Sequence, residues 1–416
     1  MKEYSAWQYL LIDVANNNGL DTDKEVFEAR IAWTEARLSS LEDFAKDKKW
    51  KQRPLYLKAV QAVRKAQEGI PIGHAVGLDA VCSCLQLMSV LSGCIEGARA
   101  TGLIDPDRRA DAYTECSTVM SNILGYHIPN ERSRVKNALM TSLFASKREP
   151  IKEFGEGTPA LKAFYQAMYQ IAPGACQLLE VLTDSWQPWA LEHCWHLPDG
   201  FNARVKVMQQ EEKRIEVDEL NHATFTYTYY INEGEDRGVK NAPNIIHSID
   251  AWVLRNMVRR CNYNPMVVEN ANRVIEAELL RRFMGDISGL GPLSPEAGYY
   301  LDIYKWFHMA DPVILPYLDA DAVSYMDLDH LKALKKIVNS MLECPPFPLL
   351  TIHDCFAAHP NNLNQVRKHY RTILAELADS TLIDKILSEI HGRPMQGPRL
   401  SVGLSSYIKN SAYGLC

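Results

Sequence analysis

The pattern of apolar and polar residues predicts a protein built mainly of helices. Apolar positions recur at helical spacing over four long stretches: Lys24 to Phe44, Asp107 to Leu124, Pro159 to Thr183 and Asn364 to Leu377. Three short segments have the apolar or β-branched character of strands between Pro, Gly or charged residues: Gly73 to Asp79, Ala223 to Ile231 and Leu349 to Asp354. The expected fold class is therefore α+β and helix-rich.

Composition places the chain among ordinary globular proteins. Its 416 residues, 47% of them hydrophobic, suffice for two or three subdomains. The ten cysteines form no CxxC pair and several lie in apolar runs, which predicts reduced thiols and a cytoplasmic protein, in the host cytoplasm if the source is viral. The first residues fit neither a signal peptide nor a transit peptide, and no apolar run approaches about 20 residues, so we expect no membrane partner.

Two features of the sequence argue against particular function classes. The net charge of −6 does not favour a nucleic-acid binder, because such proteins usually present a basic face. Neither G-x4-G-K-[ST] nor G-x-G-x2-G occurs, so a P-loop or Rossmann enzyme is not supported. The group His193, Cys194 and His196 could suggest zinc, but no second ligand pair has finger spacing, and packing is the preferred interpretation.

Two of the predicted strands end in an aspartate. The segment IGHAVGLD ends at Asp79 and PLLTIHD ends at Asp354, and a helix-forming stretch is expected after each. If the strands are neighbours in one antiparallel sheet, their carboxylates meet, and such a pair can hold two Mg²⁺ ions about 3.5 to 4 Å apart for phosphoryl transfer. For either aspartate alone, capping of the following helix is the commoner role.

A third segment, ERSRVKNALMTSLFASK, carries Arg132, Lys136, Met140 and Phe144 at intervals of four residues. This spacing predicts one stripe along a helix. Cations at its N-terminal end suit a triphosphate, and apolar groups at its C-terminal end suit a base and sugar. An ordinary amphipathic helix is the alternative.

In this order the three segments resemble motifs A, B and C of the phage and mitochondrial single-subunit RNA polymerases. The family patterns run roughly DGSCSGIQHFS, R-x3-K-x3-M-x3-Y-x-S-K and HDSF, and this chain has DAVCSCLQLMS from Asp79, the segment Arg132 to Lys147, and HDCF from His353. The segments ANNNGLDTDKEVFEARIAW, WHLPDGF and APNIIHSID also match, so the similarity runs from near residue 9 to the C-terminus.

The resemblance implies a DNA-directed RNA polymerase that transfers nucleotides from NTPs to an RNA 3′-hydroxyl and releases pyrophosphate. Asp79, Asp354 and the Ala80 carbonyl would hold two Mg²⁺ ions. The other implied roles are triphosphate binding by Arg132 and by the catalytic Lys136, nucleotide contact by Met140 and Phe144, and a position for His247 near the sugar or the growing duplex.

The choice between RNA and DNA as product depends on three positions. Family A DNA polymerases share the motif order but carry a glutamate five residues after the metal-binding aspartate, where this chain has Cys84, and a phenylalanine at the position of Met140. Both differences favour ribonucleotides. Phe144 replaces a family tyrosine whose hydroxyl helps select ribose, which predicts relaxed sugar selection. The alternatives are a family A-like or primase-like DNA polymerase, and a non-enzymatic scaffold with a polymerase shape.

The resemblance also implies a domain plan. Residues 1–105 and 247–416 would form the palm around a small antiparallel sheet, with motif C at 353–354, and residues 106–246 the fingers, with a motif B helix at about 131–147. The 105 residues between His247 and His353 exceed the family's connection, which predicts an insertion at about 252–325. The tail around Tyr413 is expected to be frayed, although in the family this end returns to the active site.

The family's N-terminal promoter domain and its D-x2-G-R motif are both absent from this sequence. The chain therefore resembles the larger subunit of the split, two-subunit phage RNA polymerases. A second, basic subunit would supply both missing parts and help bind the DNA template and nascent RNA. By analogy alone, a single-stranded-DNA-binding protein would assist promoter opening.

Overall fold

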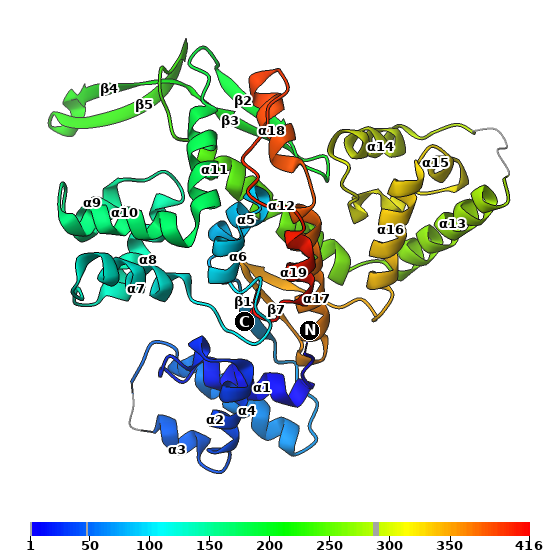
Figure 1. The fold of residues 1–416 in the computed structure, drawn as a ribbon, viewed down its shortest axis with the longest axis horizontal. Coiled ribbons are helices and arrows are strands. Elements are labelled where there is room, and N and C mark those ends of the chain that lie inside the picture. The colour runs from blue at the N-terminus through cyan, green and yellow to red at the C-terminus, as the bar shows by residue number, and fades with distance from the viewer. Residues whose placement is uncertain (1, 47–48, 286–290) are drawn as a thin grey trace.

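The computed structural model describes residues 2–46, 49–285 and 291–416, and shows several helical lobes around a central body (Figure 1). The first lobe contains α1 (Ala6–Asn16), η1 (Thr22–Lys24), α2 (Phe27–Glu35), α3 (Leu41–Ala45) and α4 (Arg53–Gln67). The single helix expected from Lys24 to Phe44 is wrong, because α2 ends at Glu35 and turns follow. Ser39 and Ser40 lie in this break, where serine hydroxyls compete with helical backbone hydrogen bonds.

A three-stranded antiparallel sheet lies at the centre of the molecule. Its strands are β1 (Val76–Asp79), β7 (Cys355–Ala358) and β6 (Leu350–Ile352), in that order. In the register of β1 and β7, Val76 pairs with Ala358 and Asp79 with Cys355. Asp354 is therefore followed by a strand and not by the expected helix, because β7 pairs with a neighbour on each side.

The C-terminal residues extend this sheet beyond β1. The Cys416 N–H donates to the Asp79 carbonyl at 3.0 Å, and the Asp79 N–H donates to the Cys416 carbonyl at 3.3 Å. Tyr413 is buried, and its ring stacks on Phe27 with centroids 5.1 Å apart. The expectation of a frayed tail is thus wrong, because the aromatic and apolar side chains of the tail are buried in the main core.

Helices pack around the sheet and form the main hydrophobic core. They are α5 (Ser83–Ser92), α6 (Ile95–Ala100), α12 (Asn241–Cys261), α17 (Leu363–Ala378), which follows η4 (Pro360–Asn362), α18 (Leu382–His391) and α19 (Leu404–Asn410). Helices α5, α12 and α17 pack against one another. Within the described residues, no helix is both long enough and apolar enough to cross a membrane.

The middle of the chain forms a second helical lobe. It contains α7 (Ala112–Leu124), α8 (Glu131–Ser142), α9 (Arg148–Phe154), α10 (Pro159–Ile171) and α11 (Pro173–Asp184). The expected helix from Pro159 to Thr183 is two helices, because Pro173 lacks an N–H and restricts the residue before it. The motif B helix expected at about 131–147 ends at Ser142, so Phe144 lies in the following turn, where Ala145 has a φ of 63°.

Two hairpins follow this lobe. The first consists of β2 (Glu192–His196) and β3 (Asn202–Lys206), and the second of β4 (Met208–Val217), η2 (Asp218–Leu220) and β5 (Ala223–Gly234). The β4–β5 hairpin projects from the body (Figure 1). Of these four strands the sequence predicted only β5, because the charged run in β4 is exposed along nearly its whole length and lacks apolar alternation.

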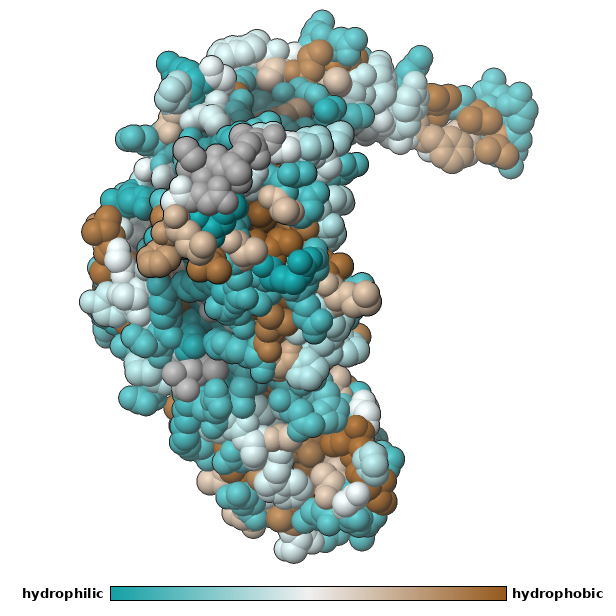
Figure 2. Space-filling view, turned by 90° about the vertical axis from the view of Figure 1, so that its right-hand side faces the viewer, coloured by the Kyte–Doolittle hydropathy of each residue, from teal (hydrophilic) through white to brown (hydrophobic). Residues whose placement is uncertain are grey.

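A separate helical subdomain lies on the other side of the body. We call it the insertion after the sequence expectation, and its status as an insertion stays a prediction. It contains α13 (Pro265–Phe283), α14 (Pro295–Phe307), η3 (Pro312–Tyr317), α15 (Ala320–Ser324) and α16 (Leu328–Met341). Its own core runs from Val268 to Met341, whereas Trp252 belongs to the main core, so the range 252–325 expected for the insertion is displaced. The part of that range at 286–290 lies outside the described residues. The face that carries the insertion is largely hydrophilic (Figure 2).

Candidate active site

Asp79 and Asp354 lie together at one end of the central sheet. Asp79 is the last residue of β1, and Asp354 lies in the turn that joins β6 to β7. The Ala80 N–H donates to the Asp354 carbonyl at 3.2 Å. The antiparallel pairing thus places two aspartates that are 275 positions apart at one end of the sheet, which meets the condition of the strand argument.

The electrostatics of this pair favour a cation. Burial and then the charge of Asp79 raise the pKa of Asp354, although the Ser83 hydroxyl and N–H donate to this carboxylate and oppose the shift. Ser83 is the first residue of α5, so the positive end of a helix dipole faces Asp354. The Cys355 thiol donates to Asp79, and burial raises the pKa of this thiol to about 12. Asp354 is therefore half-buried and senses the charge of Asp79, which is itself exposed.

Tight turns beside both aspartates fix their positions. Cys82, three residues after Asp79, has a φ of 56°, and His353, directly before Asp354, has a φ of 53°. Left-handed backbone is uncommon for residues other than glycine and often occurs at functional sites. The strand ends therefore direct the chain sharply away from the carboxylates.

The cations expected to bind a triphosphate lie on α8 and contact α7. Arg132 pairs with Asp111 at 2.7 Å, and its Nε also donates to Thr114 at 3.1 Å. The Lys136 ammonium lies 5.7 Å from the centre of the Tyr113 ring. Arg132 is therefore engaged in the absence of substrate, whereas Lys136 is exposed.

Tyr113 connects this helix pair to the aspartates. Its hydroxyl bonds to Cys82, and burial, followed by the nearby Cys82, raises its pKa, with a further contribution from Asp354. Burial also raises the pKa of Cys82, on which Asp354 and Lys136 both act electrostatically. Groups from motifs A, B and C are thus neighbours. No sequence pattern pointed to Tyr113, which lies in an ordinary helical stretch.

Phe144 and His247 form a stacked pair, with ring centroids 4.6 Å apart and planes 20° apart. The pair joins the turn after α8 to α12, and burial lowers the pKa of His247. Met140 is 44% exposed on α8. Cys84 is buried and its thiol points to the Met88 sulfur at 3.8 Å, so its contact with a sugar stays a prediction.

Asp250 is a third acid near the pair, and the sequence argument assigned it no role. It follows His247 by three positions on α12, and residues at this spacing share a helix face. Burial and then the charge of Asp354 raise its pKa to about 6, and His353 acts in the opposite direction. Asp250 ends the segment APNIIHSID, which matches the polymerase family, and this match could have drawn attention to it.

A cavity of about 490 Å³ opens beside Asp79. Charged and polar side chains from the first lobe line it, among them Asp13, Lys58 and His74, and the Nε2 atom of His74 lies 2.7 Å from the Asp13 carboxylate. Arg109 lines the cavity from the segment before α7. The cavity is large enough for part of a nucleotide, and it adjoins the carboxylates.

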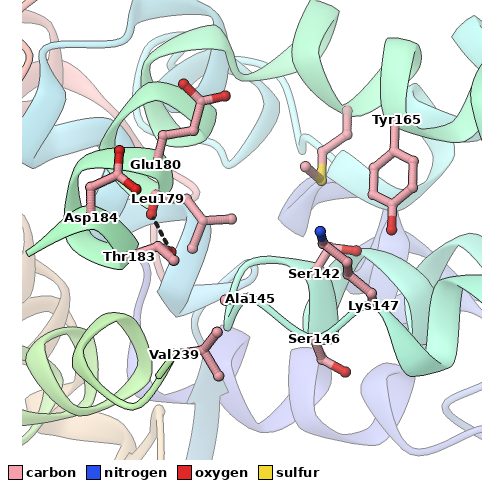
Figure 3. A pocket seen from close by; sticks show the side chains of 11 residues that line it. Ser142, Ala145, Ser146, Lys147, Tyr165, Leu179, Glu180, Thr183, Asp184 and Val239 are labelled. Atoms are coloured by element: carbon pink, nitrogen blue, oxygen red, sulfur yellow. Dashed lines mark hydrogen bonds between the residues drawn. The ribbon is translucent and has the colours of Figure 1, made fainter. Parts of the chain in front are cut away.

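A second cavity, of about 370 Å³, lies behind the turn that carries Phe144. Figure 3 shows Ser142, Ser146 and Lys147 on one side of it and Tyr165 and Leu179 on others. This cavity adjoins motif B, and neither Asp79 nor Asp354 lines it.

Two other groups could suggest a metal. His193 is engaged by Asn241 at 2.6 Å and by the Gln187 N–H at 3.3 Å, so both of its ring nitrogens are used, and packing explains it. In the described part of the chain, three side chains at mutual ligand distance do occur, in Glu216, Asp218 and His222. They are exposed at the end of the β4–β5 hairpin, far in sequence from both aspartates.

Paired strand-end carboxylates beside a cationic helix are typical of a nucleotidyltransferase. Residues 2–153 match the sequence model of the family described as DNA-dependent RNA polymerase, a range that includes Asp79, Arg132 and Lys136. Over these residues the chain is similar to DNA-dependent RNA polymerases, which supports the resemblance stated from the sequence motifs. No curated protein matches the chain.

Proposed function

We propose that this chain is the catalytic subunit of its polymerase, with Asp79 and Asp354 as ligands of two Mg²⁺ ions. The observation that carries the proposal is the position of these two aspartates at the same end of the β1–β7 pair, where the Ala80 N–H donates to the Asp354 carbonyl. The charge of Asp79 disfavours ionisation of Asp354, and a bound cation would relieve this repulsion.

The donor set fits magnesium. Carboxylate oxygens and a backbone carbonyl, here that of Ala80, are the hard ligands that Mg²⁺ prefers. Bound Mg²⁺ would supply activation of the RNA 3′-hydroxyl and charge neutralisation on the triphosphate and the departing pyrophosphate. Ser83 holds the Asp354 carboxylate through its hydroxyl and N–H, and the turns at Cys82 and His353 keep both aspartates in place.

Arg132 and Lys136 bind the triphosphate in this proposal. Lys136 is exposed, and its ammonium lies beside the Tyr113 ring. The Tyr113 hydroxyl in turn bonds to Cys82, in the turn after Asp79. Arg132 exchanges its Asp111 partner for a phosphate, which accepts hydrogen bonds in a similar geometry. Lys136 then places a positive charge where negative charge develops during transfer.

The base and sugar of the incoming nucleotide lie near Met140 and the stacked Phe144–His247 pair. His247 keeps a nitrogen for hydrogen bonding, because lowering of its pKa favours the neutral ring. The His247 ring therefore supplies part of the hydrogen bonding to the sugar that a tyrosine hydroxyl would supply at the position of Phe144. The small Cys84 leaves room for a 2′-hydroxyl, so NTPs are the preferred substrates.

The remaining assignments concern architecture and partners. The central sheet with α5, α12 and α17 forms the palm, and α7 to α11 with the hairpins form the fingers. A second subunit supplies the promoter domain and the D-x2-G-R motif, and a single-stranded-DNA-binding protein assists strand opening. The acidic net charge of this chain supports a basic partner.

The test is extension of a labelled RNA primer on a DNA template with Mg²⁺ and either NTPs or dNTPs. Wild type is compared with Asp79→Asn, Asp354→Asn and the control Asp107→Asn, an exposed carboxylate outside the site. Each protein is assayed alone and with proteins that co-purify from the source cell. NTP-dependent extension lost in both site variants and kept in the control supports the proposal; extension that survives either site substitution contradicts it.

A further inference from the structure

A cavity rich in lysine separates the insertion from the catalytic body. It measures about 430 Å³ and lies between α13 and α16 on one side and α12 and α17 on the other. Its charged lining consists of Arg260, Lys332, Lys335, Lys336, Lys368, Glu343 and Glu376. Five cations and two acids give this lining a charge of +3, although the whole chain carries −6.

Both acids of the cavity already have cationic partners. Glu376 bonds to Arg260 at 2.7 Å, and the Arg260 guanidinium is almost fully buried and held by Asn256 at 2.7 Å. Glu343 pairs with Lys368. The acids therefore do not neutralise the remaining lysines.

Two lysines of the cavity are left over. Lys335 pairs with Glu276 on α13. Lys332 and Lys336 are exposed, and in the described part of the chain neither is in an ion pair. They lie four positions apart on α16, so their side chains are neighbours on one helix face.

Two further observations point to an anion. The Ser340 hydroxyl belongs to the lining and is buried, with no hydrogen-bond partner among the described residues. Burial, together with the positive charges of Arg260 and Lys368, lowers the pKa of the neighbouring His369 to about 3. Arg260 and Lys368 thus add positive charge beside the cavity, and one buried hydroxyl of its lining has no partner among the described residues.

We infer that this cavity binds phosphate groups of a single nucleic-acid strand, an inference that rests on the proposed function for the identity of the strand. Two ammonium groups on successive turns of α16, without ion-pair partners among the described residues, suit a row of phosphates better than a single carboxylate. Helix α12 runs from His247 at the active site to Arg260 at the cavity. Thirteen residues of helix span about 20 Å, so a strand that extends a few nucleotides from the site reaches the cavity.

The test measures binding of a labelled 20-nucleotide single strand, as DNA and as RNA, by fluorescence anisotropy without NTPs. Lys332→Gln/Lys336→Gln is compared with wild type and with Lys305→Gln/Lys409→Gln, a control pair outside the cavity. We expect the cavity pair to weaken binding on the order of tenfold at about 0.1 M salt and to reduce the salt slope by about 1.4, since each single-strand contact contributes about 0.7. The control pair should change neither quantity, and thermal unfolding should match wild type.

Three outcomes would overturn the inference: unchanged affinity and slope in the cavity variant, an equal loss in the control variant, or lysine-dependent binding of inorganic pyrophosphate without any effect on the strands. Because the assay needs no catalysis, the proposed function can fail in primer extension while this binding result stands.

Discussion

The active site and the insertion are assembled in opposite ways. The active site depends on residues from distant parts of the chain: Asp79 on β1, Asp354 beside β7, and Cys416 at the other edge of β1. The insertion is a continuous run of helices with a core of its own, from Val268 to Met341. Substitutions inside the insertion core should therefore leave the carboxylates in place, whereas the sheet cannot form without both ends of the chain.

The two regions are nevertheless joined by a buried polar contact. Asp311 begins η3 of the insertion, and its carboxylate accepts hydrogen bonds from Trp252 and Asn256 of α12, each at 2.9 Å. Arg259 bridges Asp311 and Asp199. Buried charges of this kind are costly to leave unpaired, so this contact fixes how the insertion sits on α12.

The largest effect is expected at the carboxylates. Asp354→Asn should lower nucleotide transfer at least about 10³-fold, because a metal ligand is lost, and should slightly raise stability without metal, by about 1 kcal/mol or less, because repulsion from Asp79 disappears. Primer extension and thermal unfolding measure the two quantities. Mg²⁺ should raise the melting temperature of wild type and not of this variant; equal Mg²⁺ stabilisation of both would place the ions elsewhere.

The independence of the two cores is tested next. Leu334 is fully buried in the insertion core and Ile373 in the main core. Each substitution to alanine should cost about 2 to 5 kcal/mol in its own region. Hydrogen exchange should accelerate in α13 to α16 for Leu334→Ala while the β1–β7 amides stay protected, and primer extension should persist.

Ile373→Ala is the matched variant for the main core, and it should loosen the sheet and reduce extension. If Leu334→Ala instead exposed the β1–β7 amides to the same degree, the two cores would unfold as one unit, and the insertion would not be independent of the active site.

The sequence predicted the active site better than it predicted the insertion. Apolar runs that end in Asp79 and Asp354 were enough to predict two strands, whereas the adjacency of these strands was only a condition of the argument and comes from their pairing in the fold. Motif spacing also located α8, although its end depends on the turn at Ala145. Tyr113 and Asp250 were missed, because their relation to the site arises from tertiary packing that leaves no local pattern.

The boundaries of the insertion could not be derived from length alone. Helix α12 is one uninterrupted amphipathic helix, and only its contacts show that Trp252 faces the main core. The tail at 413–416 was likewise judged by its position, whereas its burial depends on β1 and Phe27. Long-range contacts decide both cases.

Acid should affect the insertion through His330. The His330 side chain is buried, and its ring stacks on that of Tyr304 with centroids 3.5 Å apart. Burial lowers the pKa of His330 to about 3, although the charge of Asp327 acts in the opposite direction. A depressed pKa means that the neutral ring stabilises the fold above the unfolded pKa of about 6.5 and that this stability is lost as pH falls towards 3. The expected loss is about 1.4 kcal/mol per pH unit within that window.

Exchange of the α16 amides at pH 6.5 and 5.5, corrected for intrinsic exchange, measures this loss. His330→Phe keeps a ring against Tyr304 and should remove most of the pH dependence from the insertion while the main core, with its own buried His369, keeps its dependence. A dependence unchanged in His330→Phe would assign acid sensitivity to other groups.

The smallest effect concerns sugar selection, which tests whether the Phe144–His247 pair belongs to the active site at all. Phe144→Tyr adds a hydroxyl beside a ring 4.6 Å away and should improve NTP over dNTP selection by about 5- to 10-fold, the effect of one hydrogen bond of about 1 kcal/mol. The ratio of kcat/KM for the two substrates on one primed template measures it. Phe144→Leu is the matched control, because it removes the stacked ring without adding a hydroxyl and should reduce use of both substrates alike. Since Leu334→Ala should leave this ratio untouched, a change in the ratio there would mean that the insertion and the active site are coupled through α12.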